Sequence, residues 1–281
     1  MAKNDKIGCR VELFERGVRT VRKTAKSSVD KLKFCHELKN AGGGKRGKVT
    51  RWSANSRSRL REWLLTRTVP REPSGAVTLT VPGEVMPESE FRDFTSKFWR
   101  EVQRAGIPCV WRIELQKRGC GHYHVVTWGR DAAFELSALW RAALGRLEVD
   151  FIMKDGKRYQ GSRTGLPRAY EICAEISPEP PTGFDGWWRY LCDHASKKKR
   201  TQLGWQGRQW GVVNRKLFCD VKPEGIDMTE KQYKGFLRQL RRLTNSHKLR
   251  GLSGASVWFS SPVTVERIAL WALDEYEVAP F

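Results

Sequence analysis

The stretch from Cys109 to Trp128 restricts the possible folds more than any other part of the chain. Apolar and polar residues alternate in CVWRIELQ (109–116) and again in HYHVVTW (122–128), and the glycine-containing KRGCG separates the two stretches. Alternation with a period of two is typical of β-strands, and glycine between two such stretches favours a turn. We therefore predict a β-hairpin over these residues.

Helical and strand patterns flank the hairpin in sequence. Phenylalanine and valine recur with helical spacing in MPESEFRDFTSKFWREVQRAG (86–106), and DAAFELSALWRAALG (131–145) has a second helical pattern. AVTLTV (76–81) and RQWGVVN (208–214) read as further strands. This order of elements predicts an α+β domain, in which helices pack on a central antiparallel sheet.

Composition divides the chain into three predicted regions. Residues 1–75 read as a basic, partly flexible extension, because KNAGGGKRGKVTRWSANSRSR (39–59) is poor in apolar residues. Residues 76–215 hold the α+β domain. Residues 216–281 read as a basic helical region that includes TEKQYKGFLRQLRRL, with Thr229 as the residue that begins its helix.

The charge indicates a polyanionic partner. The chain of 281 residues has 52 lysines and arginines against 31 acidic residues, a formal net charge of +21. Such an excess favours nucleic acid as the partner over a membrane, since no apolar run approaches the roughly 18 residues of a spanning helix. GGGKRGK (42–48) nearly matches a phosphate-binding loop, but Val49 stands where the loop needs Ser or Thr. We therefore expect no helicase motor.

The cysteines and the first residues predict a cytoplasmic location. Seven cysteines are scattered without a C-x-x-C pair, which argues against a disulfide framework and favours reduced thiols. The first residues, MAKNDKIGCRVELFERG, contain no apolar signal core.

His122 and His124 are the first candidate site residues. Because strand side chains alternate between faces, both imidazoles must point to the same side of the hairpin. Glu114 on the neighbouring strand would complete a set of two imidazoles and one carboxylate, which suits a divalent cation with open coordination positions. Two alternatives stay open: a softer, zinc-type site that includes Cys120, and ordinary packing of two strand histidines.

A second candidate element is RYLCDHASKKKR (189–200). On a helix, Tyr190 lies on the same face as Asp193 or His194 and Lys197. A phenol beside a bound cation is a reasonable nucleophile toward a phosphodiester, and a nearby lysine stabilises charge in the transition state. The alternative is a core helix with a solvated basic end.

Together these segments resemble the HUH endonuclease superfamily, named for its His-hydrophobic-His motif. TLTVPG (78–83) resembles the first motif strand, GHYHVVTW (121–128) the metal motif, and YLCDHASKKK (190–199) the helix of the catalytic tyrosine. GRQWGVVN (207–214) is similar to a stretch that follows that helix in phage-type replication proteins. The resemblance is to single-tyrosine rolling-circle initiators of phages and plasmids, such as the filamentous-phage gene II protein.

The resemblance implies roles for individual residues. His122, His124 and Glu114 would bind Mg²⁺ or Mn²⁺, Tyr190 would be the nucleophile and Lys197 its basic partner. Many relatives carry lysine where this chain has Asp193, and some carry a second tyrosine where it has His194, which argues against a two-tyrosine mechanism. DNA contacts are expected from Lys198, Lys199, Arg200, Arg208, Arg51, Trp52, Arg238 and Arg241. Trp187, Trp188 and Trp205, like Trp52, are candidates either for base stacking or for the core.

The implied activity is a site-specific, metal-dependent single-stranded DNA endonuclease and ligase that initiates rolling-circle replication through a 5′-phosphotyrosine intermediate. Its partners would be a single-stranded or hairpin origin and a host helicase and polymerase, in the cytoplasm of a bacterial host. A relaxase or a single-tyrosine transposase would use the same chemistry. The alternative from another class is a non-catalytic nucleic-acid-binding protein.

Overall fold

The computed structural model of the chain forms two compact units. The described residues are 7–15, 17–22, 53–70, 73–116, 118–153, 156–166, 168–169, 173–177, 187–188, 191–192, 208–244, 256–259 and 262–276. A central unit comprises residues 49–60 and 67–220, and a terminal unit comprises residues 1–48, 61–66 and 221–281. Helix α2 (Ala54–Thr66) runs through the boundary between these ranges.

The central unit is built on a five-stranded antiparallel sheet with the order β10-β5-β6-β4-β9. Its strands are β4 (Pro73–Thr80), β5 (Cys109–Leu115), β6 (Gly121–Trp128), β9 (Ala174–Ser177) and β10 (Trp210–Val213). Strands β5 and β6 form the predicted hairpin, with Gly119 in its turn at a φ of 90°, which favours glycine. The predicted α+β class with an antiparallel sheet is confirmed.

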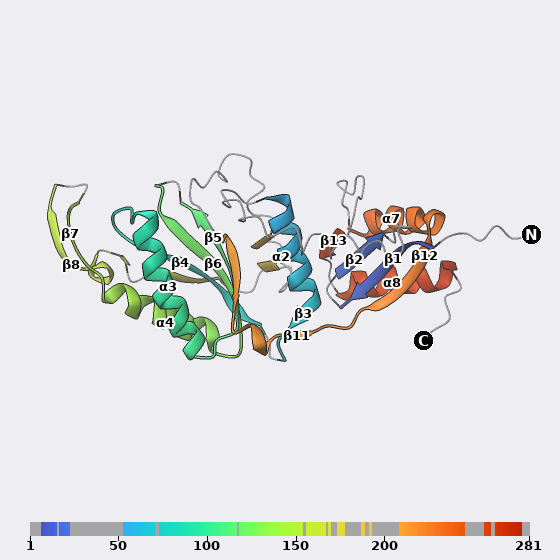
Figure 1. The fold of residues 1–281 in the computed structure, drawn as a ribbon, viewed down its shortest axis with the longest axis horizontal. Coiled ribbons are helices and arrows are strands. Elements are labelled where there is room, and N and C mark those ends of the chain that lie inside the picture. Colours follow the sequence, from blue (N-terminus) through green and yellow to red (C-terminus); the bar gives the residue numbers. More distant parts are fainter. Residues whose placement is uncertain are drawn as a thin grey trace, which may run out of the picture. The chain divides into compact units, whose positions relative to one another are not determined.

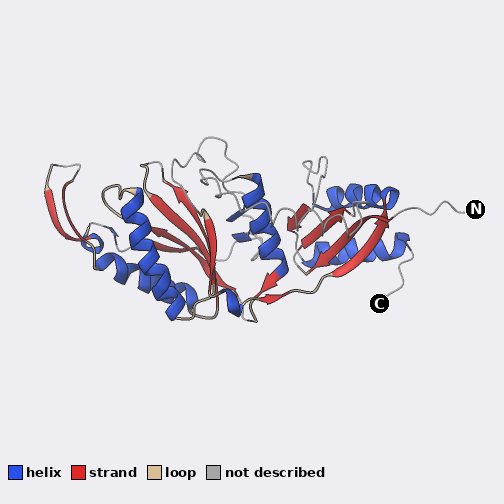
Figure 2. Cartoon of the chain, viewed as in Figure 1, coloured by secondary structure: helices blue, strands red, loops and turns tan. Residues whose placement is uncertain are grey.

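Helices α3 (Glu88–Arg104) and α4 (Ala132–Gly145) cover one face of this sheet, as Figures 1 and 2 show. Phe91, Phe98 and Trp140 are buried between the helices and the strands, where their rings pack beside Tyr123 of β6. The Trp140 indole donates a 3.0 Å hydrogen bond to the carbonyl of Thr80. The helices therefore hold the apolar face of the hairpin and leave the opposite face for the histidines.

Smaller elements complete the central unit. They are the β7–β8 hairpin (Glu148–Ile152 and Arg158–Ser162), the strand pair β3 (Arg67–Thr68) and β11 (Cys219–Asp220), and the short 3₁₀ helices η1 (Arg163–Gly165) and η3 (Arg215–Leu217). Within the described residues, each helix of the chain is too short or too polar to cross a membrane.

The terminal unit is a second antiparallel sheet that both ends of the chain build together. Its order is β12-β1-β2-β13, and two helices pack on it. The elements are β1 (Ile7–Phe14), β2 (Gly17–Arg22), β12 (Glu224–Thr229), β13 (Ser256–Phe259), α7 (Glu230–Thr244) and α8 (Pro262–Tyr276). Val11, Leu13 and Val18 on the sheet meet Phe236 and Leu240 of α7 in one core.

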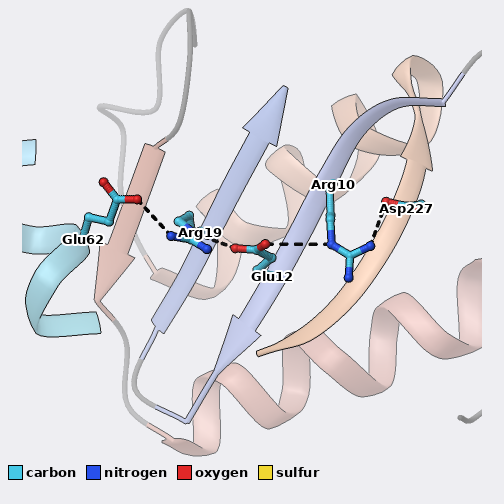
Figure 3. A network of polar contacts seen from close by, with 5 residues as sticks. All are labelled: Arg10, Glu12, Arg19, Glu62 and Asp227. Atoms are coloured by element: carbon cyan, nitrogen blue, oxygen red, sulfur yellow. Dashed lines mark hydrogen bonds and ion pairs between the residues drawn. The ribbon is translucent and has the colours of Figure 1, made fainter. Parts of the chain in front are cut away.

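The other face of this sheet carries charged side chains. Arg10 pairs with Asp227 at 3.5 Å, while Arg19 bridges Glu12 and Glu62 (Figure 3). Apolar and charged residues thus alternate along β1, as expected for a sheet with one buried face. The sequence predicted an N-terminal extension and a separate helical C-terminal region; in the structure, strands from these two regions pair in one sheet.

Thr229 begins α7, as the sequence predicted. Its hydroxyl accepts a 3.3 Å hydrogen bond from the backbone N–H of Gln232, and the Gln232 side chain accepts one of 2.8 Å from the backbone N–H of Thr229. This reciprocal capping satisfies two backbone donors at the start of the helix.

Candidate metal centre

Three neighbouring strands position the candidate site. In the register of the central sheet, Glu114 of β5 lies opposite His122 of β6, and Arg112 lies opposite His124. On the other side of β6, Thr78 of β4 lies opposite His124. All five residues are on the sheet face that α3 and α4 leave uncovered, because the core residues have the opposite parity along each strand.

The three predicted ligands converge. The Oε2 atom of Glu114 lies 3.5 Å from Nε2 of His124 and 3.8 Å from Nε2 of His122, and one ligand atom of each residue lies within 4.8 Å of the others. This cluster could hold a metal ion. Two imidazoles and one carboxylate leave further coordination positions for substrate oxygens or water.

His122 fits the role of a ligand. Both ring nitrogens are buried, and within the described residues neither makes a hydrogen bond. Burial first, and then the charges of Arg112 and Arg118, lower the pKa of His122 to about 4. Its imidazole is therefore neutral at pH 7, which is the form that binds metal ions.

Neighbouring side chains orient the other two ligands. The Thr78 hydroxyl lies 3.3 Å from Nδ1 of His124, which leaves Nε2 directed at Glu114. Arg112 donates from Nη2 to Oε1 of Glu114, so that Oε2 is the oxygen that faces both imidazoles. Such outer hydrogen bonds fix the direction of ligand lone pairs.

Arg112 also connects the site to a distant part of the chain. Its side chain is only 3% exposed, and Nη1 donates a 2.7 Å hydrogen bond to the carbonyl of Leu191. Leu191 is buried, as are Trp187, Trp188 and Cys192 near it in sequence. This hydrogen bond places Leu191, the residue after Tyr190, on the face that carries the histidines. Sequence reasoning noted Arg112 only as a polar strand residue.

Removing the Arg112 guanidinium is expected to weaken both the fold and metal binding. Arg112→Met leaves the Glu114 carboxylate and the Leu191 carbonyl without their donor, which should cost about 2 kcal/mol of unfolding free energy. Loss of the contact that orients Glu114 should also weaken Mn²⁺ binding by about 10-fold or more. Urea denaturation and calorimetric titration with Mn²⁺ measure the two effects.

A matched control is Arg146→Met, which breaks the exposed ion pair between Arg146 and Glu101. An exposed pair contributes about 1 kcal/mol or less, and this one lies away from the metal ligands. Equal effects of the two substitutions would contradict the positioning role of Arg112, and Arg112→Lys should restore part of the Mn²⁺ affinity.

Two other residues of the hairpin point away from the site. Cys120 is buried in the core cluster beneath α3 and α4, so it does not join the imidazoles, and the zinc-type alternative loses its sulfur ligand. Tyr123 is buried in the same cluster, and its hydroxyl donates a 3.2 Å hydrogen bond to Thr95. Burial raises the pKa of Tyr123, and the residue lies on the wrong face to act at the site.

The remaining predicted site residues are only partly described. Arg208, Arg238 and Arg241 are exposed, as DNA contacts would need to be, and Trp187 and Trp188 are buried, which favours packing over stacking for both. Outside the described residues lie Tyr190, Lys197, Asp193, His194, Lys198, Lys199, Arg200, Arg51, Trp52 and Trp205.

An α+β unit with a His/His/Glu cluster on an antiparallel sheet is the class of protein that fold and site define. Comparison with protein families narrows this class: residues 74–177 match the family of replication-associated proteins of the ORF2 and gene II protein type. The matched segment contains Glu114, His122 and His124, and it ends before Tyr190. No curated protein and no solved structure matches the chain. The match indicates a replication-associated function.

Proposed function

We propose that this protein is a metal-dependent single-stranded DNA endonuclease and ligase that initiates rolling-circle replication. The observation that carries the proposal is the convergence of Glu114, His122 and His124 on the sheet face where Arg112 binds the carbonyl of Leu191. The adjacent residue is Tyr190, the candidate nucleophile. The match to a replication-associated family and the net charge of +21 support the same function.

The three ligands would hold Mg²⁺ or Mn²⁺, which would supply positive charge beside a non-bridging oxygen of the scissile phosphate. Tyr190 would lose its proton and form a bond from its phenolic oxygen to phosphorus. The bond from phosphorus to the 3′-oxygen would break, and that oxygen would take up a proton and leave as a free 3′-hydroxyl. Lys197 would stabilise the charge that develops on the phosphate.

The product would be a 5′-phosphotyrosine bond. Because this ester replaces one phosphodiester with another, the reverse attack by a 3′-hydroxyl would rejoin the strand without an external energy source. A host polymerase would extend the free 3′-end, and a host helicase would unwind the duplex. Lys198, Lys199, Arg200 and Arg208 would contact the phosphates of the strand.

A covalent-adduct assay tests the proposal. The full chain is incubated with end-labelled single strands from its own origin region, with Mn²⁺ or with a chelator, and separated under denaturing conditions. We expect an adduct that needs the metal. Tight binding without an adduct in Mg²⁺ or Mn²⁺ would instead support the non-catalytic binding protein. A preference for transfer-origin or transposon-end strands would support a relaxase or a transposase.

A further inference from the structure

The terminal unit has a groove that the proposed nicking chemistry does not use. It lies along α7, where Trp271 of α8 also contributes to its wall, and has a volume of about 530 Å³. The lining residues are Lys231, Gln232, Gly235, Arg238, Gln239, Arg242 and Trp271. Figure 1 shows α7 and α8 within this unit.

The groove is positively charged. Lys231, Arg238 and Arg242 are exposed, and no carboxylate is among the described residues that line the groove. Within the described part of the chain, none of these three cations has an ion-pair partner, whereas Lys234 on the same helix pairs with Glu230 at 3.1 Å. An anion in the groove would therefore meet three positive charges that are not already neutralised.

The three cations form a line along the helix. Positions 231, 238 and 242 follow a spacing of seven and four residues, which keeps side chains on one face of α7. At 1.5 Å per residue, the line is about 16 Å long, enough for several consecutive phosphates of one strand. Gly235 lies between the first and second cation and has no side chain, so the middle of the groove stays open.

An aromatic ring and two amides share the groove with the cations. Trp271 is half-buried, and its indole packs near Phe236 with ring centroids 6.4 Å apart, which holds it in place. Gln232 and Gln239 provide hydrogen-bonding groups next to it. A cationic track with an aromatic ring is the combination that binds unpaired strands, because a free base face can stack on the ring while phosphates follow the charges.

We propose that this groove is a second nucleic-acid site, which binds a single strand with its phosphates along Lys231, Arg238 and Arg242 and one base against Trp271. The site is separate from the metal centre and does not depend on nicking. It assigns a DNA contact to Arg238 and none to Arg241, which is outside the groove. In the full chain, the terminal unit would hold single-stranded DNA independently of cleavage.

The test compares two variants that remove the same charge from the same helix. The groove variant is Arg238→Gln with Arg242→Gln, and the control is Lys234→Gln with Arg241→Gln. Binding of the full chain to fluorescent oligo(dT) is measured by anisotropy in a chelator, so that cleavage does not contribute. The groove variant should lose about 10-fold in affinity, and its salt-dependence slope should fall by about 1.4, which corresponds to two phosphate contacts.

Further measurements separate the strand from other partners. Trp271→Leu should weaken oligo(dT) binding by about 10-fold, yet leave binding to an abasic strand of equal length unchanged, since only the former offers bases to stack. Thermal melting of each variant confirms that it is folded. Equal losses in the groove and control variants would overturn the proposal, and so would a loss confined to duplex DNA.

Discussion

Tyr190→Phe is expected to abolish the covalent protein–DNA adduct while leaving strand binding near the wild-type level. The phenolic oxygen is the atom that would bond to phosphorus, and phenylalanine keeps the ring without that oxygen. The rate of adduct formation should fall by about a thousandfold or more, as when other enzymes lose their nucleophile. Denaturing electrophoresis of the labelled strand measures the adduct, and anisotropy measures binding.

The best control for this substitution is another tyrosine of the central unit. Tyr159 of β8 donates a 2.6 Å hydrogen bond to the carbonyl of Ser162 and is not among the predicted site residues. Tyr159→Phe should therefore form the adduct at the wild-type rate. An adduct that persists in Tyr190→Phe would assign the nucleophile to another residue, and mapping the labelled peptide would identify it.

Replacing both His122 and His124 with alanine is expected to remove metal binding. Each imidazole provides one of the three ligands, and Glu114 alone would keep only a weak, carboxylate-bound ion. Mn²⁺ affinity should fall by about 100-fold or more, and adduct formation should fall with it. Calorimetric titration or Mn²⁺ electron paramagnetic resonance measures the affinity. A double variant that binds Mn²⁺ like the wild type would refute the assignment, even if Tyr190 remained essential.

The single variants should differ in metal-free stability. His124→Ala loses the contact between Nδ1 and the Thr78 hydroxyl, so it should destabilise the protein by about 1 kcal/mol or more. His122→Ala should cost less, because its two buried nitrogens make no hydrogen bond within the described residues and already carry a desolvation cost. Urea denaturation with a chelator tests this order and shows whether His122 is kept for binding rather than for folding.

The hairpin and its ligands were predictable because the information is local. Alternation in 109–116 and 122–128 determines which residues share a face, and the glycine-containing turn between them restricts the pairing. The predicted placement of Glu114 across from His122 is confirmed by the register. Helices α3 and α4 were predictable for the same reason, since their apolar residues recur with helical spacing.

The terminal sheet was not predicted, although β1 carries a usable signal. Cys9, Val11 and Leu13 alternate with Arg10 and Glu12, which is the pattern of a strand with one buried face. The pattern does not name its partner, and β12 lies more than 200 residues away in sequence. Such distant strands meet only in the folded chain, so the two ends were interpreted as separate regions.

By itself, the sequence determined that His122 and His124 share one face, because strand side chains alternate whatever the strand pairs with. It also determined the basic character that favours a nucleic-acid partner. Only the tertiary structure decided that Arg112 joins Glu114 to the carbonyl of Leu191, 79 residues along the chain from Arg112. Contacts between distant residues depend on how strands and segments pack, and a local pattern of residues does not specify that packing.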